Sequence, residues 1–104
     1  MSPTESYAVG PNEPPVRDIT IGDALAEAAA EHPDRVALIV GKADPAERRQ
    51  WTYAELYQQA QTVARALTTR FKPGERVAVW APNIPEWVMM EYGCALAGVI
   101  LVTV

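Results

Sequence analysis

Residues 76–104, with the sequence RVAVWAPNIPEWVMMEYGCALAGVILVTV, decide the fold that we predict for this chain. The stretch begins with an apolar run, Arg76 to Ala81, which lacks the strict polar alternation of a half-exposed strand and so predicts a strand covered on both faces. It ends with a second apolar run at residues 99–104, and a helical segment from Pro85 to about Ala97 lies between the two. A strand, a helix and a strand at this spacing form a βαβ unit with parallel strands and a right-handed crossover. We therefore expect an α/β fold.

The helix of this unit has recognisable signals at both ends. Asn83 and Glu86 have the spacing of an N-cap and the third helical residue, and Pro85 suits the first turn, where its missing N–H costs nothing. Gly98 suits the left-handed position just after the helix. We expect Asn83 to cap this helix rather than to bind a ligand.

A second helix is predicted just before the βαβ unit. Thr52 and Glu55 have the spacing of a capping box, and Trp51 and Leu56 have that of a hydrophobic staple. Apolar residues then recur with the 3.6-residue period of a helix. Because this stripe is apolar and the other faces are polar, we expect the helix to cover a sheet. The stripe consists of Leu56, Ala60, Val63, Ala64, Leu67 and Phe71.

The segments before this helix predict a hairpin and a further helix. The run RVALIV at residues 35–40 is apolar and β-branched, and RQWT at residues 49–52 can return as its antiparallel partner. Earlier in the chain, Thr20 can cap a helix that Pro33 ends. The apolar face expected for that helix consists of Ile21, Leu25, Ala28 and Ala29.

Residues 1–18 carry four prolines and few large apolar groups, and we expect them to form a flexible N-terminal arm. The arm has neither the basic nor the apolar region of a secretory signal. The one cysteine, Cys94, lies among small apolar residues, where a buried thiol is the usual state. A single cysteine cannot form an internal disulfide, so a reducing, cytoplasmic location is expected.

The net charge of the chain argues against a nucleic-acid partner, and the length of its apolar run argues against a membrane span. The formal net charge is −4 and the nine basic residues are scattered, which does not provide the concentrated basic face that nucleic acid requires. The apolar run after Glu91 has 13 residues, fewer than the roughly 20 needed to cross a bilayer. We therefore expect no nucleic-acid partner and no membrane span.

The sequence shows no constellation of catalytic residues. Its six glycines form neither a P-loop nor a GxGxxG motif, and one histidine with one cysteine cannot supply a zinc site. Glu86 and Glu91 lie about 140° apart around their helix, so they do not form a carboxylate pair. We predict no catalytic, cofactor-binding or metal-ligating residue in this chain.

Three further side chains have both a structural and a functional interpretation. His32 lies near a helix end without a carboxylate or nucleophile close by in sequence, which favours an exposed structural role over catalysis. Trp80 and Trp87 lie near the carboxyl end of a predicted strand, where aromatic residues can line a ligand crevice. Packing in the core is the favoured interpretation for both tryptophans.

The ordered succession of segments resembles a known family. These are TIGDALAEAAAEHPDRVALIV, RQWTYAELYQQAQTVARAL and KPGERVAVWAPNIPEWVMMEYGCALAGVILVTV, which begin at Thr20, Arg49 and Lys72. Together they resemble the N-terminal stretch of AMP-forming acyl-CoA synthetases, members of the adenylate-forming ligases. The resemblance covers about residues 18–104, and the order of its segments is more specific than any one motif.

The resemblance implies a partial doubly wound, Rossmann-like subdomain with a βαβ unit and a short hairpin, incomplete relative to the N-terminal domain of a longer parent. Residues 1–18 are then the arm, and residues 19–104 the first part of the AMP-binding domain. The parent would join a carboxylic acid to ATP as an acyl-adenylate, release pyrophosphate, and form the coenzyme A thioester with release of AMP. ATP, Mg²⁺ and coenzyme A are implied for the parent, while this chain alone would bind none of them and would be inactive.

The apolar strand at residues 99–104 raises the question of its neighbours. We expect it to be an interior strand whose partners are the missing remainder of the parent. A homo-oligomer formed through the exposed strand edge is also possible. Two alternatives stay open: a small non-catalytic protein that binds itself or another partner, and a peptide-synthetase adenylation domain.

Overall fold

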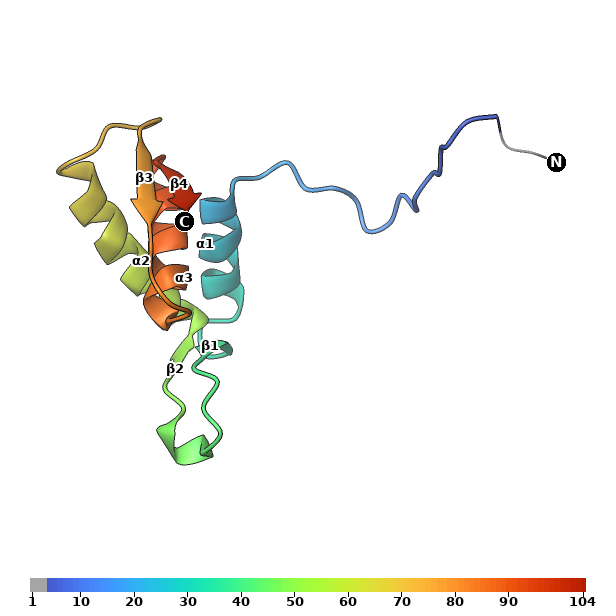
Figure 1. Cartoon of the computed structure of the whole chain (residues 1–104). Helices are drawn as coiled ribbons and strands as arrows, with labels where there is room; N and C mark the ends of the chain where they lie inside the picture. Colours follow the sequence, from blue (N-terminus) through green and yellow to red (C-terminus); the bar gives the residue numbers. More distant parts are fainter. Residues whose placement is uncertain (1–3) are drawn as a thin grey trace.

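The computed structural model describes residues 4–104, in which three α-helices carry two small sheets (Figure 1). The helices are α1 (Ile21–Glu31), α2 (Tyr53–Thr68) and α3 (Pro85–Ala97). The strands are β1 (Val36–Ile39), β2 (Gln50–Thr52), β3 (Arg76–Val79) and β4 (Ile100–Thr103). A short 3-10 helix, η1 (Pro45–Glu47), lies in the loop between β1 and β2.

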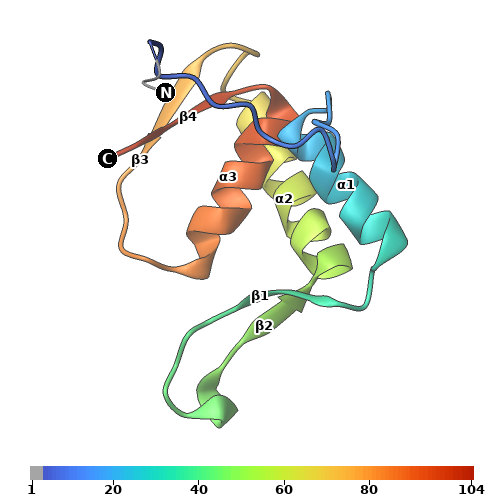
Figure 2. The same cartoon turned by 90° about the vertical axis from the view of Figure 1, so that its right-hand side faces the viewer.

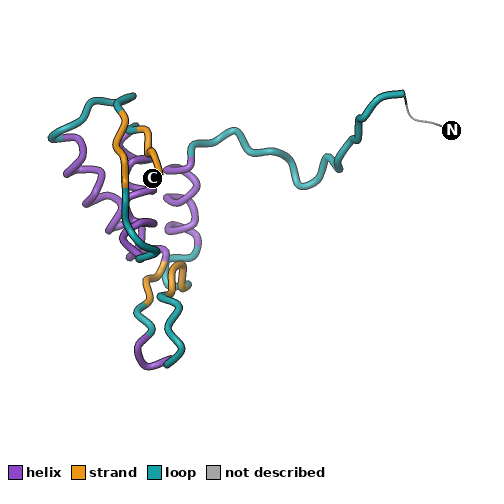
Figure 3. The backbone as a smooth tube through the Cα atoms, in the orientation of Figure 1, coloured by secondary structure: helices purple, strands orange, loops and turns teal. Residues whose placement is uncertain are grey.

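The two sheets confirm the predicted pairings. Strands β1 and β2 form an antiparallel hairpin, with Val36 opposite Thr52. Strands β3 and β4 run parallel, with Arg76 opposite Ile100 and Val79 opposite Thr103, and α3 connects them as the helix of a βαβ unit. Figure 2 shows that the hairpin lies at one end of the helices and that the β3–β4 sheet lies along their side. The loop between β1 and β2 points away from the helices (Figure 3). The predicted partial α/β fold is therefore present.

The core lies between helices, chiefly α2 and α3. Ala60 of α2 is completely buried, and Leu56 of α2 forms one cluster with Met89 of α3 and Leu25 of α1. The prediction that α2 covers a sheet is confirmed only in part: its Leu67 belongs to the buried cluster against which Val77 of β3 and Leu101 of β4 pack, but the apolar stripe packs mainly on α3, and also on α1. A sheet of two strands is too narrow to cover more than one helix, because a helix is about 10 Å across and two strands together span only about 10 Å.

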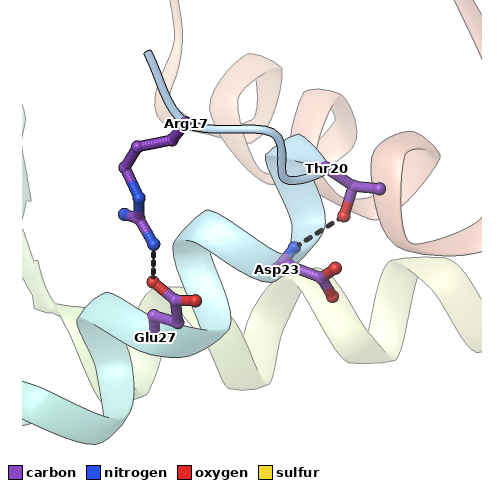
Figure 4. Close-up of polar contacts among 4 residues, drawn as sticks. All are labelled: Arg17, Thr20, Asp23 and Glu27. Atoms are coloured by element: carbon purple, nitrogen blue, oxygen red, sulfur yellow. Dashed lines mark hydrogen bonds and ion pairs between the residues drawn. The ribbon is translucent and has the colours of Figure 1, made fainter. Parts of the chain in front are cut away.

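Helix α1 begins where predicted and buries most of the predicted face, with Leu25 and Ala29 buried and Ala28 half-buried. The Thr20 hydroxyl oxygen accepts a hydrogen bond of 3.0 Å from the Asp23 N–H (Figure 4), which confirms the cap. Ile21, expected on the apolar face, is 62% exposed, and Gly22 is buried in its place. A Cβ on Gly22 would lie 2.9 Å from the Leu96 side chain, so α1 approaches α3 through this glycine.

The start of α2 confirms the capping box in full. The Glu55 N–H donates to the Thr52 hydroxyl at 3.1 Å, and the Thr52 N–H donates to the Glu55 carboxylate at 2.8 Å. Trp51, just before the cap, packs against the same cluster as Leu56, as the staple predicts. Two backbone donors at this helix end are thus paired locally.

The start of α3 differs from the prediction, whereas its end agrees with it. The N-cap is Ile84 and not Asn83, and no side chain caps it. Pro85 is the cause, because the residue before a proline is held in an extended conformation, and Ile84 has φ −124° and ψ 156°. At the other end, Gly98 has φ 72° and its N–H donates to the Cys94 carbonyl, which confirms its left-handed position.

Residues 4–20 contain no helix or strand, are exposed, and extend away from the helices (Figure 1). Near the end of this segment, Arg17 forms an ion pair with Glu27 of α1 (Figure 4). The hydrogen bond from Arg17 and the charge of the Glu27 carboxylate raise the pKa of the guanidinium. The predicted boundary of the arm at residue 18 stays a prediction, and residues 1–3 lie outside the described residues. In residues 4–104, no helix is both long and apolar enough to cross a bilayer.

The contact between α2 and α3 predicts a cost for any side chain at Gly93. A Cβ there would lie 2.4 Å from Val63 Cγ1 and 2.7 Å from Val63 Cβ. We expect Gly93→Ala to lower the free energy of unfolding by about 1–2 kcal/mol in urea denaturation, because contacts this short place the overpacking cost at about 2–3 kcal/mol, the upper end of its usual range, and the gain in helix propensity returns about 1. Adding Val63→Ala should recover part of the loss.

Gly41→Ala is the matched control, because a Cβ at Gly41 would meet no atom within 4 Å. It should change the free energy of unfolding by no more than about 0.5 kcal/mol. A Gly93→Ala variant as stable as this control would contradict the close packing.

Candidate functional site

The β3–β4 sheet has one covered and one open face. Side chains alternate between the two faces of a strand. Val77 and Leu101 point to the helix side, where they pack against a buried cluster formed by Leu67, Cys94 and Val99. The covered face therefore joins the sheet to α2 and α3.

The open face is apolar, and we call it the outer face. The register places Ala78 beside Val102, with Arg76 beside Ile100 at one end. Trp80 follows β3 and is 88% exposed. The predictions that β3 is covered on both faces and that Trp80 packs in the core are therefore wrong for the described chain. The apolar members of the outer face are Ala78, Trp80, Ile100, Val102 and Val104.

Two grooves flank this sheet, one beyond each strand. The β3 groove, of about 410 Å³, is lined by β3 and the loop after it together with Val63 of α2 and Met89 and Met90 of α3. The β4 groove, of about 330 Å³, is lined by Leu101 and Thr103 together with residues of α1 and α3. Figure 1 shows why both exist: α2 lies on the β3 side of the sheet and α1 on the β4 side, so the helices reach beyond both strand edges.

Trp87 holds the loop between β3 and α3. Its indole Nε1–H donates to the Ala81 carbonyl at 3.0 Å, and the side chain is half-buried. It lines the β3 groove and also a groove of about 260 Å³ between this loop and the hairpin. Trp87 was predicted to pack in the core, but it belongs to neither buried cluster and instead lines these two grooves.

The other residues weighed in the sequence do not come together. His32, Glu86 and Glu91 are all exposed, and His32 is the C-cap of α1. Cys94 is 1% exposed, and burial raises the pKa of its thiol. Among residues 4–104, no three His, Cys, Asp or Glu side chains lie close enough to hold a metal ion. What the described chain presents to a partner is the outer face and the strand edges beside the grooves.

Comparison with known proteins gives a family and close structural neighbours. A family model for "AMP-binding enzyme" matches residues 25–104. The medium-chain acyl-CoA ligase ACSF2 of Danio rerio, a mitochondrial protein, is 35% identical over 102 residues, which are 97% of this chain and 16% of that ligase. Acyl-CoA ligase SID4 of Ajellomyces capsulatus is 30% identical over 96 residues, 91% of this chain and 16% of that ligase. The chain thus spans about a sixth of the length of these relatives.

Solved structures agree with this picture. The N-terminal domain of FACL13 from Mycobacterium tuberculosis has a TM-score of 0.73 and 30% identity, with 83% of this chain and 21% of that one covered. The N-terminal subdomain of NpsA from Klebsiella oxytoca has a TM-score of 0.72 and 29% identity, with 82% and 21% covered. The fatty acid AMP ligase of Legionella pneumophila also has a TM-score of 0.72, at 28% identity, with 82% and 15% covered.

Proposed function

The chain belongs to the AMP-binding enzyme family, and on this basis we propose that residues 19–104 are the first part of the AMP-binding domain of an ATP-dependent carboxylic acid–CoA ligase. One observation carries the proposal: nearly the whole chain aligns with a medium-chain acyl-CoA ligase at 35% identity. In this proposal the whole ligase forms an acyl-adenylate with release of pyrophosphate, and then the coenzyme A thioester with release of AMP.

The role proposed for this chain is that of a scaffold. The described residues include no group of three His, Cys, Asp or Glu side chains that could hold Mg²⁺, and the sequence has no glycine-rich loop for a nucleotide phosphate. We therefore assign no step of the reaction to them, and propose that the residues binding ATP, Mg²⁺ and coenzyme A belong to other parts of the ligase. The remainder of the ligase is then the natural cover for the outer face.

A second candidate within the same family is a peptide-synthetase adenylation domain. It is favoured by the similarity to NpsA, which also occurs in an artificially fused adenylation–PCP di-domain NRPS. A third candidate, a small non-catalytic protein that binds itself or a partner, is favoured by the exposed apolar outer face. The names of the curated relatives favour the acyl-CoA ligase over both. A cytoplasmic location stays a prediction, and the ACSF2 relatives are mitochondrial.

A chimera tests the ligase proposal directly. Residues 20–104 would replace the aligned segment of Danio rerio ACSF2, and formation of acyl-CoA and pyrophosphate would be measured with a medium-chain acid, ATP, Mg²⁺ and coenzyme A. We expect the chimera to keep kcat/KM within about tenfold of ACSF2, since the segment supplies packing and no reacting group.

ACSF2 lacking the segment is the control for the chimera and should be inactive, because the sheet and helices that the segment contributes would be missing. A chimera that folds but forms neither acyl-adenylate nor acyl-CoA would contradict the proposal.

The 104-residue chain by itself should not bind nucleotide. Isothermal titration with ATP and Mg²⁺ should give no heat beyond dilution, because the described residues provide no phosphate-binding loop and no metal ligands. Stoichiometric binding with micromolar affinity would show that the chain contains a nucleotide site and is more than scaffold.

A further inference from the structure

The outer face of the β3–β4 sheet is exposed in the described chain. Figure 2 shows that the three helices lie on the other side of this sheet. The apolar side chains of the outer face are neighbours in the strand register, with Ala78 beside Val102 at its centre. A contiguous apolar patch that is open to solvent marks a site of interaction.

We propose that two copies of this chain pack face to face through their outer faces. The two-fold axis runs between the two sheets, perpendicular to the strands, at the level of Ala78 and Val102. Two packed sheets lie about 10 Å apart. The helices of each copy stay on the far side of its own sheet, so the dimer has four layers and its two helix layers do not meet. Both copies use the same surface, as a two-fold interface requires.

The one charged side chain on the outer face decides the direction of the strands. Arg76 is the first residue of β3, and Trp80 follows the last. When the two copies run antiparallel, β3 lies over β3 of the second copy, and Arg76 faces the second copy's Trp80. A guanidinium over an indole forms a cation–π pair, and the axis produces this pair twice.

The opposite direction leaves Arg76 without a partner. If the strands of the two copies ran parallel, β3 would lie over β4 of the second copy, and Arg76 would face the apolar Ile100 there. Covering a charge without a partner is costly. Charge therefore favours the antiparallel arrangement, in which the uncharged Ala78 and Val102 each meet their own counterpart at the axis.

The exposed area of the outer face predicts a weak dimer. Trp80 is 88% exposed, and Ile100, Val102 and Val104 are 46%, 37% and 73% exposed. These fractions correspond to roughly 400–500 Å² of apolar surface per copy, or about 1,000 Å² for two copies, which is the lower limit for a specific interface. The extended residues 4–20 contribute nothing to this area.

The test is the mass of the 104-residue chain, measured by sedimentation equilibrium from about 10 µM to about 1 mM. We expect a concentration-dependent shift toward twice the 11.4 kDa of one chain, with a dissociation constant of about 10–300 µM.

Trp80→Ser removes the largest side chain of the outer face and should raise the dissociation constant about tenfold or more. Because Trp80 is exposed in the single chain, its loss should leave the fold intact, which circular dichroism checks. Tyr7→Ser is the matched control, since Tyr7 is an aromatic residue that is 79% exposed but lies outside the sheet. It should leave the constant within about twofold.

A pair of charged variants tests the direction of the strands. Trp80→Glu places a carboxylate opposite the second copy's Arg76, whereas Trp80→Lys places a second cation there. We expect the glutamate variant to dimerise about tenfold more tightly than the lysine variant, with a difference that shrinks in added salt. The net charge of −4 acts in the other direction, because glutamate raises and lysine lowers the general repulsion between copies.

A folded wild-type chain that stays monomeric up to about 1 mM would overturn the proposal. A dimer that Tyr7→Ser weakens and Trp80→Ser does not would also overturn it, since the outer face would then not be the interface. A lysine variant that dimerises at least as tightly as the glutamate variant would reject the antiparallel arrangement. None of these results depends on ligase activity, so this proposal and the proposed function fail separately.

Discussion

The close approach of α2 and α3 is the constraint on which the rest of the structure depends. It requires a residue without a side chain at Gly93, because a Cβ there would overlap Val63, and it requires the small Ala60 on the facing helix. With these residues the helices pack closely enough to bury Leu56 and Met89 in one cluster. Interiors packed at this density tolerate little added volume.

The helix layer explains why the strands have open edges. Three helices side by side are wider than a two-stranded sheet, so α2 and α1 extend past β3 and β4 and leave a groove beyond each strand (Figure 1). A wider sheet would cover both grooves. This geometry fits the proposal that the chain contributes scaffold to a larger ligase domain.

Much of the fold could be predicted from local signals in the sequence. The caps at Thr20 and Thr52 and the glycine at Gly98 mark helix ends through hydrogen bonds with near neighbours, and these signals were correct. The cap at Asn83 was wrong because Pro85 moved the helix start by one residue. What each helix packs on could not be predicted, since Gly93 and Gly22 reveal close helix contacts only once the partner helix is known.

The exposure of Trp80 on the outer face was missed although the sequence contains a signal for it. Arg76 is the first residue of β3, and the residues two and four positions later point to the same face. A charged residue at position 76 therefore indicates that this face is open to solvent. Because Ala78, Trp80 and the β4 residues are also apolar, the alternation between an exposed and a covered face was not recognisable from hydrophobicity.

Amide hydrogen exchange tests most directly whether the helix pair supports the fold. The account predicts that the slowest amides lie in α2 and α3 around Ala60 and Gly93 and exchange only by global unfolding, while the ladder amides of Ile100 and Val104 exchange faster through local opening. Ladder amides that outlast those of the helices would contradict it, because the sheet and not the helix contact would then be the most stable part of the structure.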